Sequence, residues 1–330
     1  MANRLRFPPY MPMVGLVFSI ITTVSIVAHF CSARPGGRAP VDPEFGSHWH
    51  DGRAEIDGYR FAVRRYGEER TGQAVMVFVT EPFRASTRVK ADDPSRAPSD
   101  VFEALKLNLV RDFQTGIYDY NTMVSLFSRS DSFDPVKLTF SSAEWCGHVY
   151  EELLVEPQHL RHRVSSYFEG ETTAGTLPHP PGGVIEEELF VRLRGLRGEY
   201  LRPGDRRTVP FMAGSFHRRL THAPASWTRA EIERISELVN VQVPAGTFVT
   251  RLYVVRVTGG REGRFHIEAA YPHRIVKWAW SAARGTTAEA SESGELTGTQ
   301  RVAYWKLNGQ DGERWLKPLG LLPSPRTTGR

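Results

Sequence analysis

The chain has 330 residues, 40% of them hydrophobic and 24% charged, a balance typical of globular proteins with a sizeable core. The formal net charge is +5, and the basic residues are dispersed among acidic ones, which excludes the dense basic stripe of a nucleic-acid-binding protein. Two cysteines are too few for a small fold that depends on disulfides.

The first 33 residues carry a targeting pattern. Arg4 and Arg6 precede an apolar run from Val14 to Val27, and small residues follow near Ala33. A basic start, an apolar centre and a small-residue exit are typical of export signals, although an uncleaved membrane anchor has a similar pattern. The sequence therefore predicts an exported protein that is periplasmic or anchored in the bacterial envelope.

The two cysteines have different expected fates. Cys31 lies at the end of the leader and is a candidate for lipidation, although lipoprotein signals usually have a small residue where this chain has Phe30. If the leader is removed, Cys146 is left as a single thiol. Unpaired cysteine is among the most buried residue types, so we expect Cys146 to be buried.

Beyond the leader, short runs alternate apolar and polar residues, which is typical of half-buried strands. Two of the clearest runs are Tyr59–Val63 and Leu105–Leu109, and short turns separate most of them. This order favours an antiparallel meander. The predicted organisation is a signal peptide or anchor (1–33), a linker (34–44), a first antiparallel β half (45–170), a Pro/Gly loop (171–183), helices with a second antiparallel β half (184–320) and a disordered tail (321–330).

Two helices are predicted in the second half. The first begins near residue 184, with apolar residues at helical spacing up to Leu196 and with solvated carboxylates at Glu186–Glu188. The second covers 228–239, where Thr228 and Glu231 have the spacing of a capping box. The predicted fold is mainly β, a curved antiparallel sheet or half-barrel meander with one or two covering helices.

One stretch, Ser141–Leu153, holds chemically active residues at strand spacing. On an extended strand Glu144, Cys146 and His148 would share one face. These three residues are therefore candidates for a nucleophilic site, in which the imidazole lowers the thiol pKa. Cys146 and His148 are also candidate metal ligands together with His48 and His50. The plainer interpretation, which we favour, is a structural strand.

No general catalytic or cofactor motif supports an enzyme. The sequence lacks G-x-S-x-G, H-E-x-x-H, C-x-x-C and a Gly-rich phosphate loop with a lysine, so no cofactor is expected. Aromatic residues are plentiful, and most should be sheet core. Some are candidates to line a pocket for an apolar ligand: Trp145, Tyr167, Trp278 and Trp280.

Four runs appear in an order that resembles an uncharacterised family of exported bacterial proteins: His48–Phe83, Lys106–Arg129, Glu144–Leu153 and Ser166–Glu171. Members are often labelled "septum formation inhibitor Maf". Maf nucleotide pyrophosphatases carry S-x-S-P-R near the N-terminus, whereas this chain has only P-S-P-R at 323–326, so the resemblance implies no such activity. The last third, from Val243–Val257 to His273–Trp278, resembles periplasmic β proteins of unknown function and implies a sheet wrapped on helices, similar to lipoprotein carriers.

Two functions follow as hypotheses. The first is a non-catalytic envelope protein whose curved sheet binds a lipid, another amphiphile or an envelope protein partner, with membrane attachment through the N-terminal segment if that is retained or lipidated. The alternative is an envelope enzyme or metal-binding protein that uses Glu144, Cys146 and His148. Nucleic acid is not an expected partner.

Overall fold

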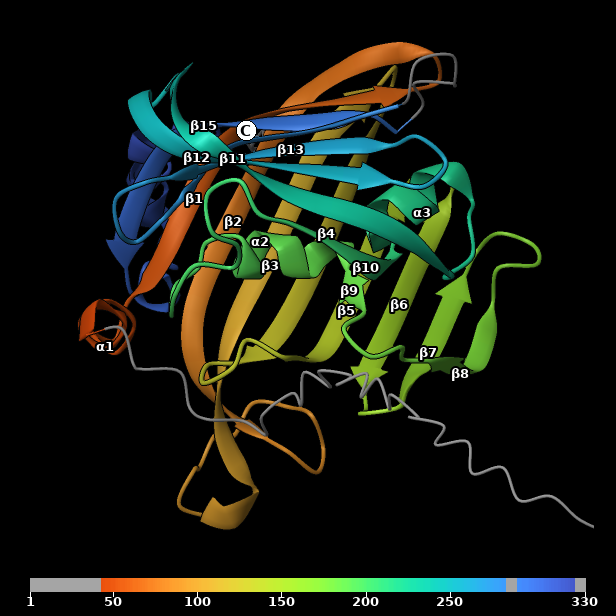
Figure 1. Ribbon diagram of the computed structural model, residues 1–330, viewed down its shortest axis with the longest axis horizontal. Coiled ribbons are helices and arrows are strands. Elements are labelled where there is room, and N and C mark those ends of the chain that lie inside the picture. Colours follow the sequence, from red (N-terminus) through yellow and green to blue (C-terminus); the bar gives the residue numbers. More distant parts are fainter. Residues whose placement is uncertain (1–42, 283–289, 324–330) are drawn as a thin grey trace, which may run out of the picture. The chain divides into compact units, whose positions relative to one another are not determined.

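The computed structural model describes residues 43–282 and 290–323, all within one compact unit. Their strands form one 15-stranded sheet in the order β8-β7-β6-β5-β4-β3-β2-β1-β15-β14-β13-β12-β11-β10-β9 (Figure 1). Neighbouring strands are antiparallel except for the short parallel pair β9 and β10. Because β8 and β9 remain as edges, the sheet is not closed. The prediction of a mainly β, antiparallel-rich fold is confirmed.

The first half of the sheet is a meander of eight strands that begins after α1 (Pro43–Trp49). These strands are β1 (Ala54–Arg65), β2 (Glu68–Arg84), β3 (Val101–Thr115), β4 (Tyr118–Arg129), β5 (Pro135–Glu144), β6 (Gly147–Val155), β7 (His159–Ser166) and β8 (Thr173–Pro178). A 3-10 helix, Pro98–Asp100, precedes β3.

The second half contains seven strands and the remaining helices. The strands are β9 (Val184–Ile185), β10 (Arg206–Met212), β11 (Trp227–Val243), β12 (Gly246–Val257), β13 (Glu262–Glu268), β14 (Ile275–Ser281) and β15 (Glu292–Val302). The helices are α2 (Leu189–Arg192), α3 (Ser215–Thr221) and 3-10 turns at Glu186–Glu188, Tyr304–Lys306, Gln310–Trp315 and Lys317–Leu319. Within the described ranges, no helix has the length and apolarity needed to cross a membrane.

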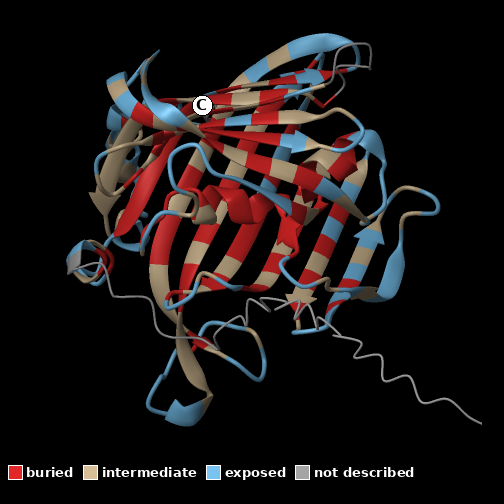
Figure 2. Cartoon of the chain, viewed as in Figure 1, coloured by how far each residue is buried: buried red, intermediate tan, exposed pale blue. Residues whose placement is uncertain are grey.

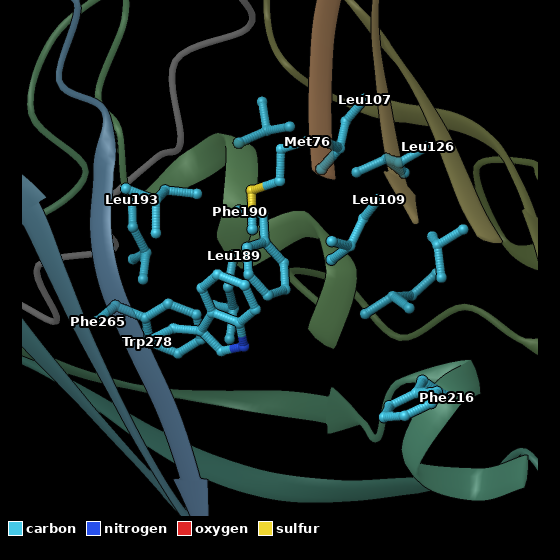
Figure 3. Close-up of a cluster of buried hydrophobic side chains, with 14 of the residues drawn as sticks. Met76, Leu107, Leu109, Leu126, Leu189, Phe190, Leu193, Phe216, Phe265 and Trp278 are labelled. Carbon is cyan, nitrogen blue, oxygen red and sulfur yellow. The ribbon is translucent and has the colours of Figure 1, made fainter. Parts of the chain in front are cut away.

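The core lies between the two halves of the bent sheet. Alternate residues of β3, such as Leu107 and Leu109, point inward and are buried, while their neighbours are only partly covered (Figure 2). Helix α2 supplies Leu189 and Phe190 to the space between the halves (Figure 3). The Phe190 ring centroid lies 5.6 Å from that of Trp278 on β14. Burial of this shared apolar surface holds the two halves together.

The predicted helix at 228–239 is wrong, because these residues belong to β11. Ala230, Ile232 and Arg234 alternate inward, and β11 pairs with both β10 and β12. The pairing register shifts between Arg234 and Leu238, which breaks the alternation. Apolar residues before and after this irregularity produced the apparent helical spacing, and tertiary pairing overrode the capping pattern.

Three other predictions need correction. In place of the helix expected from residue 184, the structure has the short strand β9, a 3-10 turn and the short helix α2. Glu186–Glu188 are buried rather than solvated. Strand β8 lies within the range predicted as a loop. At the C-terminal side, Leu321 is buried against β1 and β2, so the predicted disordered tail does not begin at 321. The predicted leader, including Cys31, lies outside the described residues.

Candidate functional site

The stretch with Glu144, Cys146 and His148 forms a hairpin turn rather than a continuous strand. Glu144 pairs with Gly147, so Trp145 and Cys146 occupy a two-residue turn between β5 and β6. Glu144 is buried on the inner face, whereas Cys146 and His148 are exposed. The expectation that the three side chains share one face is therefore wrong, because the turn interrupts the period of two. The expectation of a buried Cys146 is wrong for the same reason.

The two candidate histidines lie elsewhere. His48 Nε2 is 3.0 Å from Glu55 Oε2, and His50 Nε2 is 3.1 Å from Glu103 Oε1. Glu103 lies at the start of β3. The end of β3 pairs with the start of β4, and the start of β4 pairs with the end of β5, next to the turn that holds Cys146. About ten residues at ~3.3 Å each separate these two ends of the sheet. In 43–282 and 290–323, no group of three or more His, Cys, Asp or Glu side chains is arranged to hold a metal ion.

The four aromatic candidates divide into two kinds. Trp278 and Trp280 are buried in the core, and the Trp278 ring makes an edge contact with Tyr59. Neither tryptophan lines the cavity described below. Trp145 and Tyr167, in contrast, are largely exposed at the ends of β5 and β7.

Gly147 fixes the position of the Tyr167 ring. Its φ is +153°, and an added Cβ would lie 2.4 Å from Tyr167 Cγ. We expect Gly147→Ala to lower the free energy of unfolding by about 1–3 kcal/mol, because it combines backbone strain with a steric overlap. Thermal denaturation should show this loss but little change for Gly175→Ala, whose Cβ meets nothing within 4 Å. Equal effects of the two substitutions would contradict the steric argument.

A cavity of about 480 Å³ lies between the inner faces of β5–β8 and helix α3. We call it the α3 cavity. Its apolar wall comes mostly from the sheet and from the segment that follows α3: Phe140, Val149, Val164, Leu177, Ala223, Pro224 and Ala225. Its polar lining includes Glu151, His162, Glu171, Ser215, Arg218, Arg219 and His222. The cavity thus has an apolar wall and a charged region within one enclosure.

The charged region is built around Arg218 of α3. Its Nη2 lies 2.9 Å from both carboxylate oxygens of Glu151, and its Nε donates to the Ala213 carbonyl. His162 Nε2 lies 2.7 Å from Glu151 Oε1. Burial acts to raise the pKa of Glu151, but the Arg218 charge and the His162 hydrogen bond outweigh it and hold that pKa at about 2. Glu151 therefore stays ionised and paired at neutral pH.

Arg219 forms the second charged contact. It pairs with Glu144, which connects α3 to the end of β5, and its guanidinium lies 4.0 Å from the centroid of the Phe168 ring. Its Nε and Nη1 lack a hydrogen-bond partner within the described part of the chain. Nearby, His222 Nδ1 lies 2.6 Å from Glu171 Oε1. Cations and carboxylates are thus nearly balanced around the cavity.

The buried acidic run holds the start of α3. Glu186 accepts a hydrogen bond from the Gly214 amide, and Glu187 accepts one from the Ser215 amide. Burial and the neighbouring Glu186 charge raise the pKa of Glu187 to about 7. An added Cβ on Gly214 would lie 3.1 Å from both carboxylates, so the close approach favours glycine there. These contacts fix α3 against the sheet and position Arg218 over the cavity.

Sequence reasoning identified Glu144 but missed its partner. Arg218 and Arg219 give no local signal, because adjacent arginines without an apolar period resemble surface residues. Their partners lie 67 and 75 positions away in the sequence, and no local pattern indicates such pairing.

No family model matches the chain, and no curated protein matches it. Among solved structures, the chain is similar to a DUF1089 family protein from Pseudomonas aeruginosa at 12% identity and a TM-score of 0.32, covering 52% of this chain and 82% of that one. A protein from Bacteroides fragilis with a YmcC-like fold matches at 12% identity and a TM-score of 0.19, covering 74% of this chain and 99% of the other. At these scores neither likeness carries an argument about function.

Proposed function

We propose that this chain is a non-catalytic protein of the bacterial cell envelope that binds a small amphiphile in the α3 cavity. The observation that carries the proposal is the division of that cavity into an apolar wall and a charged region. Ligand sites are typically concave and mostly apolar, with a few polar groups that set orientation. The sequence-predicted leader supports the envelope location.

In the proposed complex the apolar part of the ligand lies along Phe140, Val149 and Val164. Its polar end lies beside Arg218 and His162, which already pair with Glu151. Because these charges are balanced, a neutral or zwitterionic head fits better than a strongly charged one. The alternative enzyme or metal site at Glu144, Cys146 and His148 has no convergent geometry to support it.

Native mass spectrometry of the full chain purified from the envelope tests the class of ligand. We expect an added mass that disappears after extraction with organic solvent, as a bound lipid or related amphiphile would. An added mass that resists organic extraction but is removed by a chelator would favour the metal-binding alternative. A protein that carries no adduct and does not bind the probe described next would contradict the proposal.

A cavity-filling variant tests the place of binding. We expect Val164→Trp to weaken binding of the fluorescent probe N-phenyl-1-naphthylamine at least about tenfold, or ~1.4 kcal/mol, because the indole would occupy the cavity. Ser165→Trp is the matched control, because Ser165 is the next residue on β7 and is exposed on the other face. Titration followed by probe emission, with lysophosphatidylcholine as competitor, measures both. Equal binding by the two variants would place the ligand elsewhere.

A further inference from the structure

Four hairpin turns in the first half of the sheet lie at the same end of its strands. The last pairs before three of the turns are Arg65 with Glu68, Thr115 with Tyr118 and Glu144 with Gly147. The β7–β8 turn follows Ser166, which pairs with Val149 near the start of β6. Strands β1, β3, β5 and β7 thus all end at the same side of the sheet. There the end of β1, the end of β5 and the turn after β7 contact the C-terminal end of α3 and the residue that follows it.

Each of these turns presents one large, exposed apolar side chain. We call the set the turn rim; its members and exposed fractions are Tyr66 (53%), Ile117 (81%), Trp145 (69%) and Tyr167 (66%). Among the described residues, only Leu238 and Leu322 are other large hydrophobic residues more than half exposed. Isolated exposed hydrophobics are ordinary on a surface, but a row repeated on successive turns indicates an interaction surface.

Three of the four rim side chains, those of Tyr66, Trp145 and Tyr167, are held in place by specific contacts. Trp145 Nε1 donates to Asp119 Oδ1 at 3.1 Å, and the Tyr66 and Tyr120 hydroxyl oxygens lie 3.0 Å apart. The Tyr167 ring packs over Gly147. Tryptophan and tyrosine that present an apolar body and a bonded polar end suit the boundary between lipid headgroups and acyl chains.

The charges on the same turns indicate which lipid surface fits. Exposed carboxylates flank the rim on three of the four turns: Glu68, Glu69, Asp119 and Glu169. Arg64 is also exposed and Glu68 pairs with Arg70, but the four carboxylates outnumber these two arginines, so an anionic lipid surface would repel the turns. A zwitterionic surface avoids that repulsion and leaves apolar insertion as the source of affinity.

The rim also borders the α3 cavity. Phe168 follows Tyr167 in the chain and packs on both Arg219 and His222, two residues that line the cavity. We propose that the turn rim is a membrane-contact surface that seats in the headgroup region of a zwitterionic bilayer, beside the mouth of the α3 cavity. This contact goes beyond the proposed ligand binding and does not require it.

The exposed thiol of Cys146 gives a probe site inside the rim. Full-length Cys31→Ser protein, labelled at Cys146 with the fluorophore NBD, is mixed with phosphatidylcholine vesicles. We expect at least a twofold rise in NBD emission, and quenching when the lipids carry nitroxide groups near the headgroup. The matched control carries the label at Ser132→Cys in a Cys31→Ser/Cys146→Ser background, because Ser132 lies in the exposed β4–β5 turn at the opposite end. We expect no response there.

Side-chain variants separate the rim from any anchoring by the N-terminal segment, which every variant retains. We expect Ile117→Ser/Tyr167→Ser to remove most of the Cys146 response, and Leu238→Ser/Leu322→Ser to preserve it. Circular dichroism checks that each variant is folded. Three results would overturn the proposal: a response that survives the rim substitutions, an equal response at Ser132, or a response that needs anionic phosphatidylglycerol and vanishes in salt.

The naphthylamine titration with Val164→Trp contains no vesicles, so failure of the membrane-contact proposal is distinguishable from failure of the ligand-binding proposal.

Discussion

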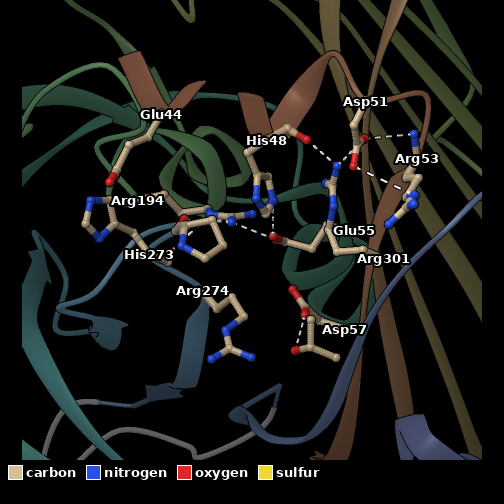
Figure 4. Close-up of polar contacts among 12 residues, drawn as sticks. Glu44, His48, Asp51, Arg53, Glu55, Asp57, Arg194, His273, Arg274 and Arg301 are labelled. Atoms are coloured by element: carbon tan, nitrogen blue, oxygen red, sulfur yellow. Dashed lines mark hydrogen bonds and ion pairs between the residues drawn. The ribbon is translucent and has the colours of Figure 1, made fainter. Parts of the chain in front are cut away.

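Replacing Arg194 with Met will lower the free energy of unfolding by about 3–5 kcal/mol, the usual cost of breaking a buried ion pair. Arg194 is fully buried, and its Nη2 lies 2.6 Å from Glu55 Oε1 (Figure 4). It also donates to the carbonyls of Pro272 and His273 and stacks on the Phe78 ring. The substitution would leave the Glu55 carboxylate buried with only His48 beside it.

Urea denaturation followed by tryptophan fluorescence measures this loss. The double variant Arg194→Met/Glu55→Gln should recover part of it, because the uncompensated charge is then gone. Arg206→Met removes an exposed arginine that pairs with Glu233, and it should leave stability nearly unchanged. A loss at Arg194 no larger than that at Arg206 would contradict the importance assigned to the buried pair.

The second large effect concerns pH. Burial and the neighbouring Glu55 charge raise the pKa of Asp57 to about 8, while its Oδ1 accepts a hydrogen bond from Thr299. The folded protein therefore holds a proton that the unfolded chain releases above pH ~4. Below pH ~4 the contribution of this proton to the free energy of unfolding is fully present. The contribution is lost as the pH rises through about 8, and the free energy of unfolding then falls by up to ~1.4 kcal/mol per pH unit. We expect Asp57→Asn to reduce this loss.

The best window for the measurement is from roughly pH 6.5 to 8.5. Below it, His217 and His266 oppose the effect, because burial lowers both pKa values to about 4 and the unfolded chain then binds more protons. Glu187, with a pKa near 7, acts in the same direction as Asp57 at the lower end of the window. Urea denaturation across this range should show a flatter profile for Asp57→Asn than for the parent chain. The exposed control Asp119→Asn should keep the parent slope.

The strands could be predicted because their signal is local. In β3 apolar and polar residues alternate along the sequence, and buried and partly exposed residues alternate with them. Most of the strands are joined by short turns, which are also local. The sequence of β11 resembles that of a helix because an irregularity in its pairing with β12 displaces its apolar residues from period two. No local sequence pattern indicates helix α3, because its first turn is fixed by Glu186 and Glu187, which lie 28 residues earlier in the sequence than their partners.

The candidate site was predictable only in part. Glu144 belongs to the wall beside the α3 cavity, but the reason is its contact with Arg219, which no spacing indicates. The residue types of Trp145 and Cys146 suit a strand, whereas the pairing of Glu144 with Gly147 makes these two residues a turn. Buried charges such as Arg194 resemble surface residues in a sequence, since only the folded chain brings their partners close.

The position of β15 has a consequence for biogenesis. It is the last of the described strands in the chain, yet it fills the gap between β1 and β14. Until it is available, β1 and β14 each present an unpaired edge, and such edges recruit other chains into aggregates. The sheet can therefore be completed only after the chain has been synthesised as far as Val302, which leaves the edge of β1 open throughout the synthesis of the residues between β1 and β15.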